Sequence, residues 1–457
     1  MGTTQLFFAC SQYAAATVSA AVRAGCFGPR SEHRRVLVVS DRSTMPEIGV
    51  PLDRMPGFEA LRPDFDEVRS WNEFIHPFHP ADWSPREQDT LLWERALRRT
   101  WNLGSGPVEI ACESIQGNPS KAAAKVFADS PVHVYADGLM SYGPTRSAID
   151  PQLSTRIQRL LYLDLVPGLR PLLLTEFGLE PEIVPTATFA KVLAELSDAA
   201  ADFGCDLQHL QTGPALLLGQ YLSAIDVLTA EEERRLHVRM LRGVARLGHR
   251  HIVFKPHPSA PLSWSRALGE EADRLGIEFR VLDSPVLAEV LYQRLRPALV
   301  VGCFSTALLT ASCLYELPVV RCGTDVLLDR LSPYQNSNRV PVTIVDALLP
   351  DLEDGTAATS RSSSRAHEGR GELADLVSAV GFTMQPGIYP GLRPSAECYL
   401  SGHLNGHTWR YFDRRRLTRL GLPGSTPARF AFIPRNGRVR RVARRARSVQ
   451  RSVLRRV

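Results

Sequence analysis

Residues 299–310 read LVVGCFSTALLT and decide the fold, because they combine a buried strand, a tight turn and a helix start. The Val-rich run stops at Gly302, and Ser305 and Thr306 come just before a helix-compatible apolar stretch. The start of a helix leaves backbone N–H groups unpaired and carries a partial positive charge. Two adjacent hydroxyls at this position therefore predict an anion site suited to a phosphate.

A second anchor lies upstream, at residues 251–258, HIVFKPHP. This stretch predicts another buried strand, whose C-terminal end presents Lys255 and His257. Pro258 fixes the backbone angle φ and helps to end the strand. Ligands of open parallel sheets bind at this edge, so we expect one phosphate to contact both anchors.

Apolar runs and helix-compatible stretches alternate along the whole chain. Further strands are predicted at residues 5–9, 35–40, 108–112, 132–135, 215–218, 277–282 and 318–321. Helices are predicted at residues 14–24, 86–101, 118–127, 188–203, 229–247 and 285–295, with a capping box of Thr229 and Glu232. Such alternation is typical of parallel sheets covered by helices on both faces. The expected fold class is α/β, with two Rossmann-like parallel-sheet domains facing across a cleft (GT-B) and a C-terminal extension.

The predicted organisation has five parts. Residues 1–185 form the first Rossmann-like domain and residues 186–350 the second. Residues 351–375 turn from acidic to Ser-, Gly- and Arg-rich, which predicts a flexible linker. Residues 376–434 regain aromatic side chains and are expected to pack on the body, without an assigned role. Residues 435–457 form a basic tail.

Composition favours a reducing cytosol. The eight cysteines form no CxxC pair, so neither a disulfide framework nor a zinc site is expected. The first residues lack the basic start of a signal peptide, and no apolar run reaches the ~18 residues of a spanning helix.

The net charge of +6 is concentrated at the end of the chain. Residues 435–457 contain ten arginines and no acid, so the remainder carries −4. On a helical wheel the valines of this tail fall on one side and the arginines on the other. We therefore predict attachment to an anionic membrane surface, and consider nucleic acid, which Arg runs also bind, the less favoured partner.

Four motifs together resemble the bacterial sialyltransferases, most closely the alpha-2,8-polysialyltransferase family. They are YADGLMSYGP at 135–144, LLLGQ at 216–220, KPHP at 255–258 and FST at 304–306. The resemblance extends over residues 4–350. It implies a GT-B fold, CMP-sialic acid as the donor, and an inverting reaction that requires no metal or other cofactor.

The resemblance also implies roles for individual residues. Asp137, before Gly138, corresponds to the general base for the acceptor hydroxyl; the family often has two acids there, whereas this chain has Ala136 and one carboxylate. The alternative for Asp137-Gly138 is an ordinary turn. His257 corresponds to the histidine that, as imidazolium, stabilises the departing phosphate.

The remaining assignments concern the donor. Ser305 and Thr306 match the pair that holds the CMP phosphate, although an N-cap is their structural alternative. Lys255 adds positive charge. Glu289 is placed to bind ribose hydroxyls, an exposed helical residue being the alternative, and Gln220 ends a strand at the cleft.

The sequence thus predicts a cytoplasmic, peripherally membrane-bound sialyltransferase with a CMP-sugar donor and a glycan acceptor. No metal site is expected: Asp64 and Asp66 form the only DxD motif and are interpreted as solvated charge. The nearest alternative is a CDP-glycerol glycerophosphotransferase or another GT-B transferase. A catalytically silent binder of nucleotide or glycan is the alternative of another class.

Overall fold

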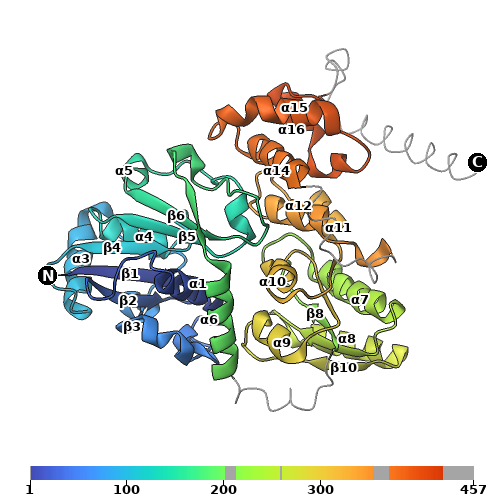
Figure 1. Ribbon diagram of the computed structural model, residues 1–457, viewed down its shortest axis with the longest axis horizontal. Helices are drawn as coiled ribbons and strands as arrows, with labels where there is room; N and C mark the ends of the chain where they lie inside the picture. The colour runs from blue at the N-terminus through green and yellow to red at the C-terminus, as the bar shows by residue number, and fades with distance from the viewer. Residues whose placement is uncertain (1, 201–212, 258–259, 355–369, 426–457) are drawn as a thin grey trace, which may run out of the picture. The chain divides into compact units, whose positions relative to one another are not determined.

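The computed structural model describes residues 2–200, 213–257, 260–354 and 370–425, and contains two parallel β-sheets (Figure 1). The strand order is β3-β2-β1-β4-β5-β6-β7 in the first sheet and β10-β9-β8-β11-β12 in the second. In both sheets the first strand is central, the second and third strands are added in turn on one side of it, and the fourth strand pairs with its other side. This is the Rossmann order, so the expected α/β fold with two Rossmann-like domains is confirmed.

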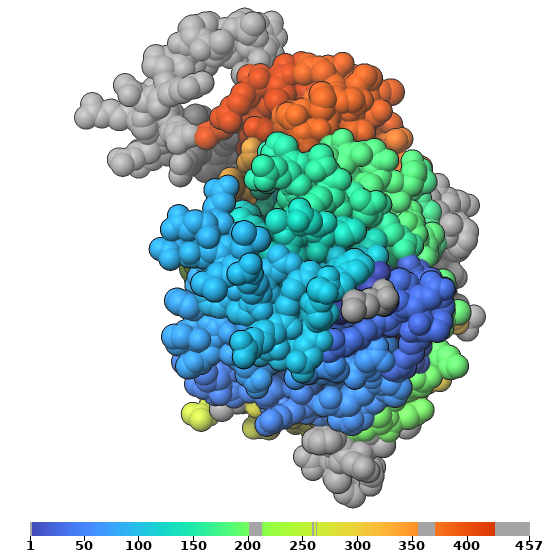
Figure 2. Space-filling view, turned by 90° about the vertical axis from the view of Figure 1, so that its left-hand side faces the viewer, coloured from blue at the N-terminus to red at the C-terminus, as the bar shows by residue number. Residues whose placement is uncertain are grey.

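The first domain, blue to green in Figure 2, contains the larger sheet. Its strands are β1 (Thr3–Ala9), β2 (His33–Val39), β3 (Glu67–Ser70), β4 (Val108–Cys112), β5 (Val132–Ala136), β6 (Ile157–Leu163) and β7 (Pro181–Val184). Its helices are α1 (Gln12–Arg23), α2 (Trp71–Ile75), α3 (Thr90–Thr100), α4 (Ser120–Val126) and α5 (Pro151–Ser154). The sequence predicted four of these strands and missed β3, β6 and β7. Two of the three have only four residues, and in β6 the first isoleucine is followed by two polar residues, Gln158 and Arg159.

The second domain follows the predicted order of elements closely. Its strands are β8 (Ala215–Leu218), β9 (His251–Lys255), β10 (Glu278–Val281), β11 (Leu299–Gly302) and β12 (Val319–Arg321). Its helices are α7 (Ala230–Arg246), α8 (Leu262–Leu275), α9 (Ala288–Leu295), α10 (Thr306–Tyr315), α11 (Thr324–Arg330) and α12 (Arg339–Leu348). The predicted capping box starts α7: Glu232 N donates to Thr229 Oγ1 at 3.2 Å, and Thr229 N donates to Glu232 Oε2 at 2.9 Å. Helices α8, α11 and α12 were not predicted.

Helix α6 (Thr186–Ala199) connects the two sheets and packs against α1 of the first domain and α9 of the second. Its buried face includes Phe189, whose ring centroid lies 5.3 Å from that of Tyr13 in α1. On the other side, Arg294 Nη2 donates a hydrogen bond of 2.7 Å to Ser197 O. The helix therefore contacts helices of both domains, and its predicted last residues, 201–203, lie outside the described part.

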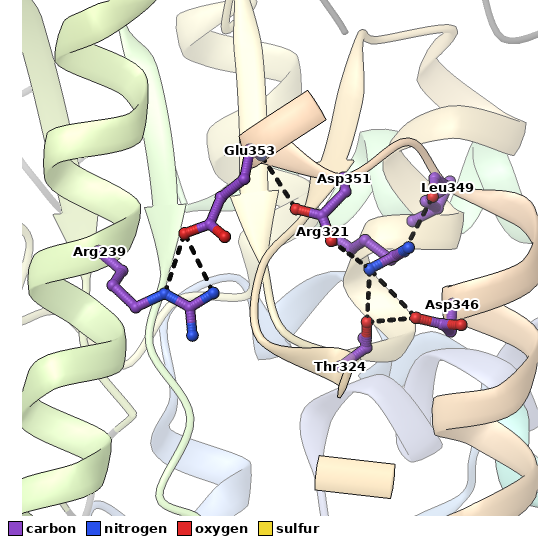
Figure 3. A network of polar contacts seen from close by, with 7 residues as sticks. All are labelled: Arg239, Arg321, Thr324, Asp346, Leu349, Asp351 and Glu353. Carbon is purple, nitrogen blue, oxygen red and sulfur yellow. Dashed lines mark hydrogen bonds and ion pairs between the residues drawn. The ribbon is translucent and has the colours of Figure 1, made fainter. Parts of the chain in front are cut away.

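A buried polar network closes the edge of the second domain (Figure 3). Arg321, at the end of β12, pairs with Asp346 of α12 at 3.1 Å and with Asp351 at 2.6 Å. Its guanidinium also donates to Thr324 Oγ1 and Leu349 O. Because a buried guanidinium needs partners for its donors, these contacts fix α12 and the segment after it to the sheet.

The chain after the second domain returns to the first. Within the predicted linker, residues 355–369 lie outside the described part, whereas Asp351 bonds to Arg321 and residues 370–375 belong to α14 (Arg370–Met384). Helix α14 packs on α12. Beyond it, the hydroxyl of Tyr389 accepts a hydrogen bond of 3.0 Å from Thr145 N and donates one of 2.6 Å to Glu176 Oε2.

Residues 397–425 belong to a separate compact unit. It contains the end of α15 (Arg393–His403) and α16 (Arg414–Leu420). Aromatic contacts organise it: Tyr399 stacks on His403 with centroids 4.6 Å apart, and the guanidinium of Arg414 lies 4.7 Å from the centroid of a Trp409 ring. The predicted basic tail, 435–457, lies outside the described residues.

Two further observations bear on the sequence predictions. Among the described residues, no helix combines the length and the apolar character needed to cross a bilayer. The seven cysteines in this part of the chain are all free thiols, and Cys205 lies outside it.

Candidate active site

Each sheet has a topological switch point, between its first and fourth strands, where open α/β sheets bind ligands. In the second domain this point lies between β8 and β11, and Phe304 N donates a hydrogen bond of 3.0 Å to Gln220 Oε1. In the first domain it lies between β1 and β4, and Cys10 N donates to Glu113 Oε1. At both points, a side chain thus joins the loops that follow the two strands.

Ser305 and Thr306 lie at the N-terminus of α10, as the sequence predicted. Ser305 is the N-cap residue, with extended backbone angles, and its Oγ accepts a hydrogen bond of 3.2 Å from Ala307 N. The capping role is therefore confirmed. Because Ser305 makes the cap, the Thr306 hydroxyl and the positive end of the helix dipole are available to a group that lies at the N-terminus of α10.

The segment in front of α10 is Asp137-Gly138 of the first domain. Leu139 N lies 3.4 Å from Thr306 Oγ1, a long and weak hydrogen bond. A Cβ atom on Gly138 would lie only 2.8 Å from the same oxygen. Gly138 has an extended backbone, so glycine is needed here for the close approach and not for a left-handed turn. The carboxyl ends of the two sheets therefore meet at this contact, as in the GT-B arrangement.

Asp137 follows β5 directly and is partly buried. Desolvation raises its pKa, although its own backbone amide and the positive charge of Arg42 oppose the rise. A raised pKa is typical of a general base, because it makes the ionised carboxylate a stronger proton acceptor.

Glu113 is a second carboxylate at this site, which sequence analysis missed. Its Oε2 lies 3.8 Å from Arg42 Nη2, and its side chain is 13% exposed. Burial, together with the charge of Asp137, raises the pKa of Glu113 to about 7. The motif before Gly138 has a single carboxylate, as the sequence indicated, and Glu113 from the neighbouring strand adds a second one to the site. Glu113 directly follows a strand that was correctly predicted, and this position at the end of a strand could have identified it as a candidate site residue.

Lys255 and His257 lie at the end of β9, where they were expected. Lys255 Nζ donates a hydrogen bond of 3.0 Å to Ser284 O, and burial lowers its pKa to about 8. Desolvation and the neighbouring Lys255 charge also lower the pKa of His257. Both effects favour the neutral imidazole when no ligand is bound. A bound anion would favour its protonated form. Pro258 lies outside the described residues.

Glu289 is buried in α9, so the alternative of an exposed helical glutamate was wrong. Burial raises its pKa to about 7, while a hydrogen bond with Thr310 and the charge of Lys255 oppose the rise. The Thr310 hydroxyl in turn lies 3.4 Å from the hydroxyl of Tyr13 in the first domain. Glu289 thus lies behind α10, next to the contact between domains.

The comparison with protein families decides the classification. The sequence profile described as Alpha-2,8-polysialyltransferase (POLYST) matches residues 5–324 of the 457-residue chain. The chain belongs to this family. With its two Rossmann-like domains, the family member is a glycosyltransferase, and the matched range includes each predicted site residue.

Solved structures similar to this polysialyltransferase-family chain are distant in sequence. The GT-B domain of a Photobacterium damselae sialyltransferase is 10% identical, with a TM-score of 0.41 over 79% of this chain and 98% of that chain. A Rickettsia africae glycosyltransferase is 10% identical, with a TM-score of 0.39 over 89% of this chain and 100% of that chain. No curated protein sequence matches the chain.

Acidic residues outside the site of this family member make structural ion pairs. Arg23 Nε lies 2.9 Å from Asp64 Oδ2, and Arg35 N donates a hydrogen bond of 2.8 Å to Asp66 Oδ2. Asp64 is therefore largely buried in an ion pair, so its interpretation as solvated charge was wrong, whereas Asp66 is exposed, as that interpretation expected. Within the described residues, no group of three or more His, Cys, Asp or Glu side chains has the geometry of a metal site.

Proposed function

We propose that this protein transfers sialic acid from CMP-sialic acid to a glycan hydroxyl, with inversion and without a metal. The observation that carries the proposal is the contact between Asp137-Gly138 of the first domain and Thr306 of the second. It brings a candidate base within one residue of a candidate phosphate site. The weak bond from Leu139 N to Thr306 Oγ1 is one that a phosphate oxygen can replace.

The donor phosphate would bind at the N-terminus of α10. Thr306 supplies a hydroxyl, the helix supplies its dipole, and Lys255 supplies a positive charge from the end of β9. Because CMP carries a single phosphate, these groups can neutralise it without Mg²⁺. Glu289 behind the helix is the carboxylate assigned to the ribose hydroxyls.

Catalysis would use groups from both domains. Asp137 takes the proton of the acceptor hydroxyl as that oxygen bonds to the anomeric carbon of sialic acid. The bond from that carbon to the phosphate breaks, and CMP leaves with the bonding electrons. His257 becomes protonated near the phosphate and stabilises the growing negative charge. Attack from the side of Asp137, with departure toward α10, inverts the configuration.

The decisive experiment compares Asp137→Asn with Asp129→Asn, a control at an exposed carboxylate of the same domain. D137N should reduce release of CMP from CMP-sialic acid in the presence of acceptor by about 100-fold or more, as expected for loss of a general base. CMP affinity should change little, and EDTA should leave wild-type turnover unaltered.

Other results would overturn the assignment. D137N turnover within a few-fold of wild type would place the base elsewhere. Faster turnover of CDP-glycerol than of CMP-sialic acid would favour a glycerophosphotransferase, and inhibition by EDTA reversed by Mg²⁺ would contradict a metal-independent reaction.

A further inference from the structure

Glu113 and Asp137 lie at the carboxyl ends of the adjacent parallel strands β4 and β5. In the register of the two strands, Cys112 pairs with Val134, so Glu113 continues at the level of Tyr135. Asp137 comes two residues after Tyr135. The two carboxylates thus directly follow neighbouring strands at the same edge of the sheet, where the charge of Asp137 acts on Glu113.

The Glu113 carboxylate is held from two directions. Cys10 N donates a hydrogen bond to Oε1, and Arg42 lies 3.8 Å from Oε2. These two contacts fix the orientation of the Glu113 side chain. The held geometry matters because two carboxylates at such a site repel each other when both are ionised.

Charges around the pair are unbalanced. The titratable or charged groups that act on it among the described residues are Cys10, Tyr13, Arg42, Cys112 and Tyr135. Of these, Arg42 alone is a cation. One guanidinium balances one carboxylate, so the second is most easily accommodated as the neutral acid.

We propose that Glu113 and Asp137 form a carboxylate pair that holds one proton in the resting enzyme, and that Glu113 thereby sets the pH range in which Asp137 works as the base. This inference rests on the proposed function of Asp137. Glu113 is a positioning residue in this scheme, since it acts on Asp137 and not on the substrate.

The proton balance of the step is simple. When the pair loses its resting proton to solvent, the two negative charges make Asp137 a stronger base than an isolated aspartate. The acceptor O–H bond then breaks, its proton returns to the pair through Asp137, and the oxygen bonds to the anomeric carbon. CMP leaves with the electron pair, and the enzyme ends the step in its singly protonated state.

The test is the pH dependence of kcat/KM, whose acid limb reports protonation of the free enzyme's base. The wild-type acid limb is expected near the pKa of about 7 of Glu113. In Glu113→Gln the repulsion is gone, while the carbonyl can still accept the bond from Cys10 N. Its acid limb should move to lower pH by about one unit or more.

Two further variants and one control distinguish a change in the charge of the pair from a folding defect. Arg42→Met removes the balancing cation at a side chain that is 45% exposed, and should move the acid limb to higher pH. Glu113→Asp keeps the charge and should restore a limb near that of wild type. Glu109→Gln, in the same strand but paired with Gln5, is the matched control and should leave the limb unmoved.

The outcomes separate the two proposals. If D137N is inactive and the limbs of E113Q and R42M coincide with that of wild type, the shared proton is wrong and the general base stands. If D137N remains active, the proposed function of Asp137 fails, and the pair loses its role with it. Limbs that move in opposite directions in E113Q and R42M support the pair.

Discussion

Two glutamates, Glu113 and Glu289, remain in surroundings that disfavour their charge. The pKa of each is raised to about 7, in both cases mainly by burial. A buried carboxylate with so raised a pKa lowers the stability of the fold at neutral pH, because it must lose its proton inside the protein. Such groups are concentrated at functional sites, which supports the roles proposed for both.

Glu289→Gln should therefore stabilise the protein at alkaline pH while weakening CMP binding. Between the ordinary value of 4.5 and the folded-state pKa of about 7, the native state binds more protons than the unfolded state. Stability consequently falls as pH rises through this window, and the full cost, up to about 3 kcal/mol, is present above pH 7. Thermal denaturation at pH 5 and pH 8 measures the difference.

The expected pattern is a higher melting temperature for E289Q than for wild type at pH 8 and a much smaller difference at pH 5. Glu59→Gln, at an exposed glutamate paired with Arg62, is the control and should show no such dependence. A pH-independent effect of E289Q would mean that its charge is not the destabilising feature. Unchanged CMP affinity would remove Glu289 from the donor site.

At the scale of single residues, the sequence predicted which side chains belong to the site better than it predicted their contacts and pKa values. Ser305 was recognised as a helix cap because the signal is local, within a few residues. The pairing of Glu113 with Asp137 was not, since it depends on two strands being neighbours and in register. The lowered pKa of His257 was not predicted either, because it depends on desolvation and on the charge of Lys255.

At the scale of elements, the unit from β11 to α10 was predictable because its Val-rich strand and its helix are both strongly apolar. Strands β3 and β7 were not, since four residues at the edges of a sheet leave little hydrophobic pattern. The connection from β5 to η5 (Leu139–Tyr142) is a different case. An ordinary turn was the alternative that its sequence left open, and the structure shows an extended glycine in close contact with the second domain.

Gly138→Ala should impair activity without unfolding either sheet. Its Cβ atom would meet Thr306 Oγ1 at 2.8 Å, so the two elements must move apart. Overpacking of this kind costs about 1–3 kcal/mol. If the strain is relieved by separating the domains, kcat/KM should fall by about tenfold or more, since each 1.4 kcal/mol is a factor of ten. Steady-state kinetics and a melting curve measure the two effects.

The control for this element is Gly117→Ala, where a Cβ atom meets nothing within 4 Å. Combining G138A with Thr306→Ala removes the clashing oxygen, so the two losses should be less than additive. Strict additivity, or a G138A enzyme as active as wild type, would show that the close approach does not matter for catalysis.

At the scale of the molecule, the sequence predicted two Rossmann-like halves because the strand and helix pattern repeats in each. It also predicted a connecting helix at residues 188–203, but not the contacts that this connection makes. Helix α6 contacts both domains, and after α14 the chain returns to the first, where Tyr389 bonds to Thr145. These contacts join residues far apart in sequence, and no local pattern encodes them.

Charge is also distributed at this scale, and it supports a prediction about location. Residues 435–457 contain ten arginines and no acid, while the remainder of the chain carries a net charge of −4. We propose that this tail binds the enzyme to an anionic membrane surface. Each basic residue near such a surface contributes on the order of 1 kcal/mol, and salt screens the attraction.

Full-length protein should therefore sediment with phosphatidylserine vesicles at low ionic strength and dissociate as salt rises. A variant truncated after Pro434 should stay in the supernatant and keep its activity on a short water-soluble acceptor, because the predicted site residues all precede the truncation. Phosphatidylcholine vesicles are the control for charge. Equal sedimentation of the two forms would contradict membrane binding by the tail, and salt-sensitive binding to duplex DNA that anionic vesicles fail to displace would identify nucleic acid as its partner.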